Sequence, residues 1–148
     1  MNDVAARPEI SPAVLREGIL DIEAKIAATP GALFGDDVAP LTHTFADGLY
    51  IRTIVMPKGM LITSKIHKKT HPYFVMEGEV TVLTDEGEVR IRAPYAGITK
   101  AGTKRVLYIH KRCVWITVHA TKETDLKRIE AEIIAESFSG IDFEGDGL

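Results

Sequence analysis

The stretch PYFVMEGEVTVLTDEGEVRIR, residues 72–92, decides the fold because short apolar runs alternate in it with turn residues. The runs cover residues 72–76, 80–84 and 89–92, with Glu77-Gly78 and Asp85-Glu86-Gly87 between them. They are rich in Val, Ile, Thr, Tyr and Phe, the residues that favour a pleated, half-buried backbone. The pattern predicts β-strands, the last two joined as a hairpin.

The same pattern extends in both directions, from Leu41 to about His119. Further strands are predicted over residues 49–56, 61–67, 106–110 and 114–119, with turns at Asp47-Gly48, Pro57-Lys58-Gly59 and Lys111-Arg112. No helical pattern interrupts these runs. They therefore predict an all-β, antiparallel sandwich or barrel.

A helix is predicted on each side of the strands. Ser11-Pro12 is a capping residue followed by proline, which starts a helix, and Thr29-Pro30-Gly31 ends it. Its apolar stripe consists of Leu15, Ile19, Ile22 and Ile26. The second helix carries Leu126, Ile129 and Ile133 on one face, with Asp125 or Thr124 as its cap.

We expect a single domain with three zones. Residues 1–40 form the first helix and a linking loop over 32–40, residues 41–120 the barrel, and residues 121–148 the second helix and a tail that frays from residue 137. The apolar stripes of the helices need a surface to cover. They are therefore expected to pack on the outside of the barrel or across a homodimer.

Composition excludes several classes of protein. The chain has 148 residues, a net charge of -3 and one cysteine, Cys113, which is expected to be a buried apolar residue. That charge argues against nucleic-acid binding through bulk electrostatics. Residues 1–9 lack the apolar core of a targeting signal, and no apolar run is long enough to span a membrane. A cytoplasmic protein is expected.

The candidate site lies within residues 61–75. If this segment stays extended, side chains at alternate positions share one face, which would bring Lys65, His67, His71 and Tyr73 together. Such polar groups inside a barrel need water, a metal ion or a ligand as partners.

The segment that contains these residues resembles the first motif of the cupin superfamily, a glycine followed by His-x-His, a glutamate and a second glycine. The run YFVMEGE, residues 73–79, is its most typical part. With Gly78 at the second glycine, His67 takes the second histidine position, His71 the glutamate position and Lys65 the first histidine position. The resemblance covers about residues 42–119 and implies a cupin-type antiparallel β-barrel, the double-stranded β-helix or jelly roll.

The second cupin motif, Pro-x-Gly-x-x-His, resembles residues 100–105, with Arg105 at the histidine position. A typical cupin site holds a divalent metal with three histidines and one glutamate, whereas this chain has lysine and arginine at two of those positions. His67 and His71 could still hold Zn, Ni, Fe or Mn. A third ligand would have to be supplied by His43, His110, His119 or Tyr73.

The same residues also suit a pocket for an anion. Arg105 and Lys65 supply positive charge for a carboxylate or phosphate, Tyr73 lines the pocket, and His67 or His71 could act as a general acid or base. Metal-free cupins with histidine and basic residues include sugar-nucleotide epimerases, which this pattern resembles.

Structural roles remain open for every one of these residues. Both histidines could be satisfied pocket residues, Lys65 could reach solvent at the barrel mouth, and Arg105 could pair with Glu77 or Asp85. At the strand ends, His110 and His119 are expected to face solvent, and Tyr108 and Trp115 to be core or dimer-contact aromatics.

Three functions follow from these alternatives. The first is a cupin that binds a small anionic ligand, with or without a divalent metal. The second is a metal-dependent cupin oxygenase or isomerase that uses His67 and His71. The third is a non-catalytic structural protein, because compact cupin-like chains also occur in phage and prophage contexts. The resemblance further implies a homodimer, while the net charge and the lack of a long apolar run argue against nucleic-acid and membrane partners.

Overall fold

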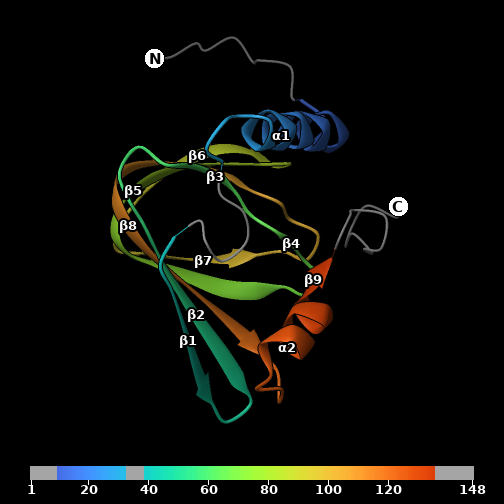
Figure 1. The fold of residues 1–148 in the computed structure, drawn as a ribbon, viewed down its shortest axis with the longest axis vertical. Helices are drawn as coiled ribbons and strands as arrows, with labels where there is room; N and C mark the ends of the chain where they lie inside the picture. Colours follow the sequence, from blue (N-terminus) through green and yellow to red (C-terminus); the bar gives the residue numbers. More distant parts are fainter. Residues whose placement is uncertain (1–9, 33–38, 136–148) are drawn as a thin grey trace, which may run out of the picture.

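The computed structural model describes residues 10–32 and 39–135 of the chain (Figure 1). The predicted linking loop 32–40 falls largely outside these residues, and the predicted tail 137–148 falls entirely outside them. The described elements are, in order, α1 (Pro12–Ala27), β1 (Leu41–Ala46), β2 (Leu49–Met56), β3 (Leu61–Thr63), β4 (Ile66–His67), β5 (His71–Thr84), β6 (Gly87–Arg92), β7 (Tyr95–Thr99), β8 (Val106–Ala120), α2 (Leu126–Ile133) and β9 (Ile134–Ala135).

The two longest strands, β5 and β8, pair antiparallel along most of their length and organise the sheet. One half of β5 pairs with β7 and the other half with β6, while β8 pairs with β2 at one end and with β3 at the other. Two half-sheets therefore share the same central pair of strands. The apolar core lies on their inner faces and includes Met56, Val75, Val80, Ile109 and Trp115.

The predicted breaks at Glu77-Gly78 and Lys111-Arg112 are wrong as strand ends. Both lie inside continuous strands, at the register shifts of the β5–β8 ladder between Val75 and Val80. A β-bulge bends a strand without ending it, so turn residues can occur in mid-strand. Gly78 has φ of 94°, and a Cβ there would overlap the carbonyl oxygen of Arg112 and lie 2.7 Å from that of Lys111. Only glycine permits this bend.

The predicted strand 61–67 is also divided. Ser64 and Lys65 are not part of a strand, so β3 pairs with β8 whereas β4 pairs with β9, next to the second helix. Two strands, β1 and β7, were not predicted individually. In the sheet, β1 pairs with β2 and β7 pairs with β5. The predicted antiparallel all-β class with two flanking helices is confirmed. Within residues 39–135 the sheet does not close into a continuous barrel.

Both helices form as predicted and pack against the strands of the same chain. Ser11 caps α1 by accepting a hydrogen bond from Val14 N–H, and Asp125, not Thr124, caps α2. On α1, Ile19 is fully buried, and on α2, Ile129 and Ile133 pack against Tyr50 of β2. Neither described helix has the length and apolar character that crossing a bilayer requires.

Candidate metal centre

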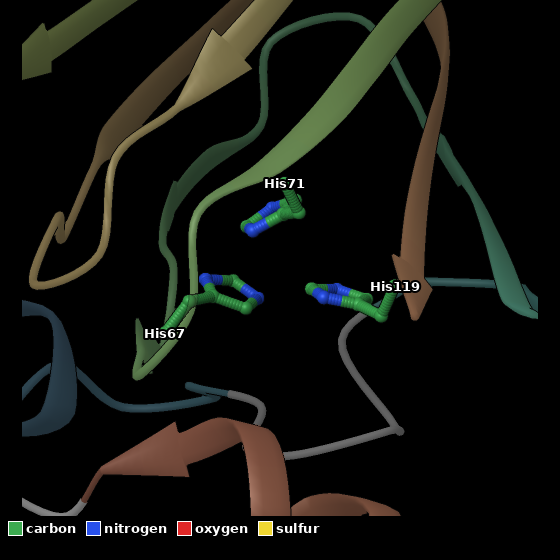
Figure 2. Close-up of side chains that lie close together, drawn as sticks. All are labelled: His67, His71 and His119. Carbon is green, nitrogen blue, oxygen red and sulfur yellow. The ribbon is translucent and has the colours of Figure 1, made fainter. Parts of the chain in front are cut away.

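Three histidines from separate segments meet on the inner side of the sheet (Figure 2). His67 lies on β4, His71 begins β5 and His119 lies near the end of β8. The ring centroids are 4.5 Å apart for His67–His71, 4.1 Å for His71–His119 and 5.3 Å for His67–His119. One ring nitrogen from each lies within 4.8 Å of those of the other two. We call these residues the histidine cluster.

The register of the central strands explains how His119 reaches the cluster. Tyr73 of β5 lies opposite Thr117 of β8. Because the strands are antiparallel, His71, two residues before Tyr73, and His119, two residues after Thr117, emerge on the same inner face. The sequence interpretation placed His119 at a solvent-facing strand end, which is wrong, because its side chain is only 3% exposed. The alternation Trp115, Thr117, His119 along one buried face was the signal that could have identified it.

His67 reaches the cluster in a different way from the one predicted. The chain does not stay extended between His67 and His71, because residues 68–70 form a bend. Lys68 N–H donates to the Ile133 carbonyl, and Gly102 N–H donates to the His67 carbonyl, which holds the bend in place. The two histidines therefore meet because the chain folds back, not because side chains alternate.

The predicted alternation of side chains does not place Lys65 either, because this residue lies between β3 and β4 and not in a strand. Its ammonium group binds the Glu130 carboxylate of α2 at 2.8 Å, and its side chain is 46% exposed. Lys65 lines the cavity described below, where its ammonium group pairs with Glu130 of the second helix.

Four buried ring nitrogens of the cluster have no hydrogen-bond partner within residues 10–32 and 39–135. These are His67 Nδ1, His71 Nε2 and both nitrogens of His119. His71 Nδ1 lies 3.1 Å from the Lys69 carbonyl oxygen, so Nδ1–H donates there and Nε2 keeps its lone pair. A neutral imidazole has one donor and one acceptor nitrogen, and each left unpaired costs about 1–3 kcal/mol. The cluster therefore presents nitrogen atoms that a ligand or a metal ion could bind.

The surroundings keep all three imidazoles neutral. Burial lowers the pKa of His71 to about 4 and that of His119 to about 3, and it lowers the pKa of His67 well below its usual 6.5. The positive charge of Arg105 lowers all three pKa values further. Near pH 7 each ring therefore has a free lone pair, the form in which histidine binds metals.

Arg105 is buried beside the cluster, and the ion pairs considered for it are wrong. Arg112 pairs with Glu77, and Arg16 pairs with Asp85. Arg105 Nη1 instead donates to the Thr99 hydroxyl at 2.5 Å, while Nε has no partner. Burial lowers the pKa of Arg105 to about 10, so the group still carries its charge near pH 7.

Aromatic rings hold the Arg105 guanidinium in place. Its central carbon lies 5.0 Å from the Trp115 ring centroid and 5.7 Å from that of Tyr73, within the range of cation–π contacts. The two rings stack at 4.6 Å with an interplanar angle of 6°. Burial raises the pKa of Tyr73 to about 12, so its hydroxyl stays protonated. Trp115 is a core residue as expected, whereas Tyr108 is 44% exposed.

The remaining histidines lie outside the cluster. His43 Nδ1 lies 2.6 Å from the Tyr50 hydroxyl, and His110 Nε2 lies 2.6 Å from the Thr81 hydroxyl. Of the third ligands considered from the sequence, His119 is therefore the one that the fold brings to His67 and His71.

A cavity of about 700 Å³ opens next to these groups. His67, His119, Arg105 and Trp115 belong to its wall, together with apolar residues of β2 and β3 and residues from both helices. His71, 2% exposed, is not part of the wall in the described chain. A small molecule in the cavity would therefore meet two of the imidazoles and the buried arginine.

The histidine cluster fits a divalent transition metal. Three neutral imidazoles with converging, unpartnered nitrogens are ligands that suit Zn²⁺, Ni²⁺ and Fe²⁺. The hydrogen bond from His71 to the Lys69 carbonyl orients one ring as second partners of metal-bound histidines do. The glutamate of the typical cupin set has no counterpart in the cluster, where His71 takes its place.

Comparison with known proteins reveals similarity in fold alone. No family model matches the sequence, and no curated protein matches it. Among solved structures, a protein of unknown function from Vibrio parahaemolyticus has a TM-score of 0.50 at 10% identity, covering 57% of this chain and 90% of that one. A cupin superfamily protein from Desulfitobacterium hafniense DCB-2 has a TM-score of 0.49 at 10% identity, covering 60% and 83%.

An RmlC-like cupin from Methanocaldococcus jannaschii, described as a double-stranded β-helix, is also similar. Its TM-score is 0.47 at 14% identity, and the match covers 66% of this chain and 93% of that one. Cupin-domain proteins are thus among the solved structures to which the chain is similar.

Proposed function

We propose that this chain is a metal-binding cupin that holds a divalent transition metal through His67, His71 and His119 and presents it to a small ligand in the adjacent cavity. The observation that carries the proposal is the convergence of three buried, neutral imidazoles whose ring nitrogens have no protein partner. Zn, Ni and Fe are the first candidates, since imidazole suits each of them, and Mn, which prefers oxygen ligands, is the last.

Three protein ligands leave coordination positions open for water or a ligand. When bound, the metal would supply a Lewis acid at the wall of the cavity. The charge of Arg105 favours an anion as that ligand. Lys65, expected from the sequence to share this role, is already paired with Glu130.

A second candidate function is catalysis at the same centre, as in a metal-dependent oxygenase or isomerase. The observation that favours it is the position of His67 and His119 in the wall of a cavity large enough for a substrate. In that case Arg105 would orient the substrate beside the open coordination positions.

Metal content of the purified protein tests the proposal. We expect close to one divalent metal ion per chain by elemental analysis, and loss of most of it in H119Q. The matched control is H110Q, which removes a histidine bound to Thr81 outside the cluster and should leave the metal content unchanged.

The stability of wild type and H119Q, measured with and without added metal, provides a second test. Metal at one hundred times its dissociation constant should stabilise the chelator-treated protein by about 2.7 kcal/mol, and the effect should vanish in H119Q. Wild-type protein that neither retains nor regains Zn, Ni, Fe or Mn, with unchanged melting temperature in the presence of each, would refute the proposal.

A further inference from the structure

We infer that the cavity takes a small carboxylic acid with an apolar body, whose carboxylate binds Arg105 and Thr117. The inference rests on the proposed function only where it couples this ligand to the metal. The binding site for the carboxylate is defined by the chain's own residues and can be tested without a metal.

The guanidinium of Arg105 keeps an N–H group that could bind a ligand. Nη1 is occupied by the Thr99 hydroxyl, whereas Nε is buried and has no hydrogen-bond partner among the described residues. The edge that carries Nε has two parallel N–H groups, which match the two oxygens of a carboxylate. Because Trp115 and Tyr73 hold the plane of the guanidinium, this edge is fixed in direction before a ligand arrives.

A second polar group without a partner lies on the same inner face. Thr117 is 3% exposed, and its hydroxyl oxygen makes no hydrogen bond in the described chain. The strand register places Thr117 directly between Arg52 of β2 and Tyr73 of β5. The Thr117 hydroxyl can donate to a carboxylate oxygen. Arg52 and Tyr73, opposite Thr117 on the two adjacent strands, add positive charge and an aromatic ring.

No carboxylate of the cavity wall neutralises Arg105. The acidic side chains in the wall, within the described residues, are Glu23 and Glu130. Glu23 binds the buried Lys104 at 2.6 Å, and Glu130 binds Lys65 at 2.8 Å. A buried cation without a counter-charge is costly, so an anion from solution would relieve that cost.

The rest of the wall decides what is attached to the carboxylate. Aliphatic and thioether side chains form a large part of the wall, among them Ile54, Met56, Met60, Ile62 and Leu107. Against these side chains a hydrocarbon or aromatic body gains contacts, whereas the hydroxyl groups of a sugar or a nucleotide would lose water.

The carboxylate and the metal should bind cooperatively. Arg105 and two imidazoles of the cluster, His67 and His119, line the same cavity, so the charge of Arg105 opposes positive charge at that place. A metal dication meets the same opposition, and a carboxylate paired with Arg105 reduces it. By linkage, the metal must raise carboxylate affinity by the same factor.

The experiment measures binding of hexanoate, hexanamide and inorganic phosphate by titration calorimetry, with and without Zn²⁺. We expect hexanoate to bind wild-type protein at least about tenfold more tightly than hexanamide, its neutral analogue, and than phosphate. R105Q should lose about tenfold or more in hexanoate affinity, and T117V should lose severalfold. R112Q, which removes an exposed arginine paired with Glu77, is the matched control and should bind like wild type.

The outcomes separate this inference from the proposed metal centre. Hexanoate binding that depends on Arg105 in the metal-free protein supports the inference even where Zn²⁺ does not bind. Equal hexanoate affinity in wild type and R105Q, or no binding at millimolar hexanoate in either metal state, overturns it. Tighter binding of phosphate than of hexanoate also overturns it, because the ligand class would then be wrong.

Discussion

Acidification should destabilise the metal-free protein through the histidine cluster. Burial lowers the folded-state pKa of His71 to about 4 and of His119 to about 3, whereas an unfolded histidine has the ordinary value of 6.5. Below 6.5 the unfolded chain therefore binds protons that the folded chain does not. The stability that these groups contribute is present above that value and is lost as the pH falls below it.

The size of the loss follows from the two pKa values. Between about pH 7.5 and pH 5, each buried imidazole favours unfolding by about 2 kcal/mol, since 1.36 kcal/mol corresponds to one pKa unit. His71 and His119 together give about 4 kcal/mol. Burial lowers the pKa of His67 in the same direction, so this residue adds to the loss. Typical domains are stable by about 5–15 kcal/mol, so the effect is a large fraction of the total.

Urea unfolding in the presence of a chelator measures this loss at both pH values. Arg90 lowers the pKa of Glu79, and a hydrogen bond from Lys69 lowers that of Glu132. Both carboxylates therefore lose their contribution below 4.5, outside the chosen window. H71Q and H119Q should each reduce the difference in unfolding free energy between the two pH values by about 2 kcal/mol. The control H110Q should keep the full difference. Wild-type stability that is equal at pH 7.5 and pH 5 would show that the three rings are not buried as neutral groups.

Two further changes test the fold around the site. G78A should destabilise the protein by about 2–4 kcal/mol because the added Cβ would overlap the Arg112 carbonyl. G59A, at φ of 86° with open space around it, should cost only about 1–2 kcal/mol. Similar urea midpoints for the two variants would contradict the close approach at Gly78. E23Q should cost about 1–3 kcal/mol because it leaves the ammonium group of Lys104 buried without its counter-charge, and the double variant E23Q/K104M should recover most of that loss in the same assay.

The fold was predictable where local pattern and tertiary structure agree. Alternating apolar residues and turn residues predicted most of the strands, and the capping residues Ser11 and Asp125 marked the starts of both helices. The mid-strand bend at Gly78 was not predictable, because glycine serves equally in a turn and in a bulge. What decides between them is the partner strand, and the carbonyl groups of Lys111 and Arg112 lie more than thirty residues away in the sequence.

The site was predictable only in part for the same reason. His67, His71 and Arg105 were singled out because motif positions marked them, and the fold does bring these three side chains close to one another. Lys65 lines the same cavity, although the chain is not extended from residue 61 to residue 75 as predicted. His119 was one of four possible third ligands and could not be chosen among them, because its place depends on the pairing of β5 with β8, which no local pattern reveals.

The structure separates two kinds of positive charge, and this separation makes the site's chemistry specific. The histidines are neutral at pH 7, so they attract a metal through lone pairs and do not attract an anion through charge. Arg105 keeps its charge, so it attracts an anion and repels a metal. The histidine cluster and Arg105 therefore favour ligands of opposite charge. The proposed carboxylate, bound in the cavity beside the proposed metal, would give a partner to both, and we therefore propose that the histidine cluster and Arg105 form one site.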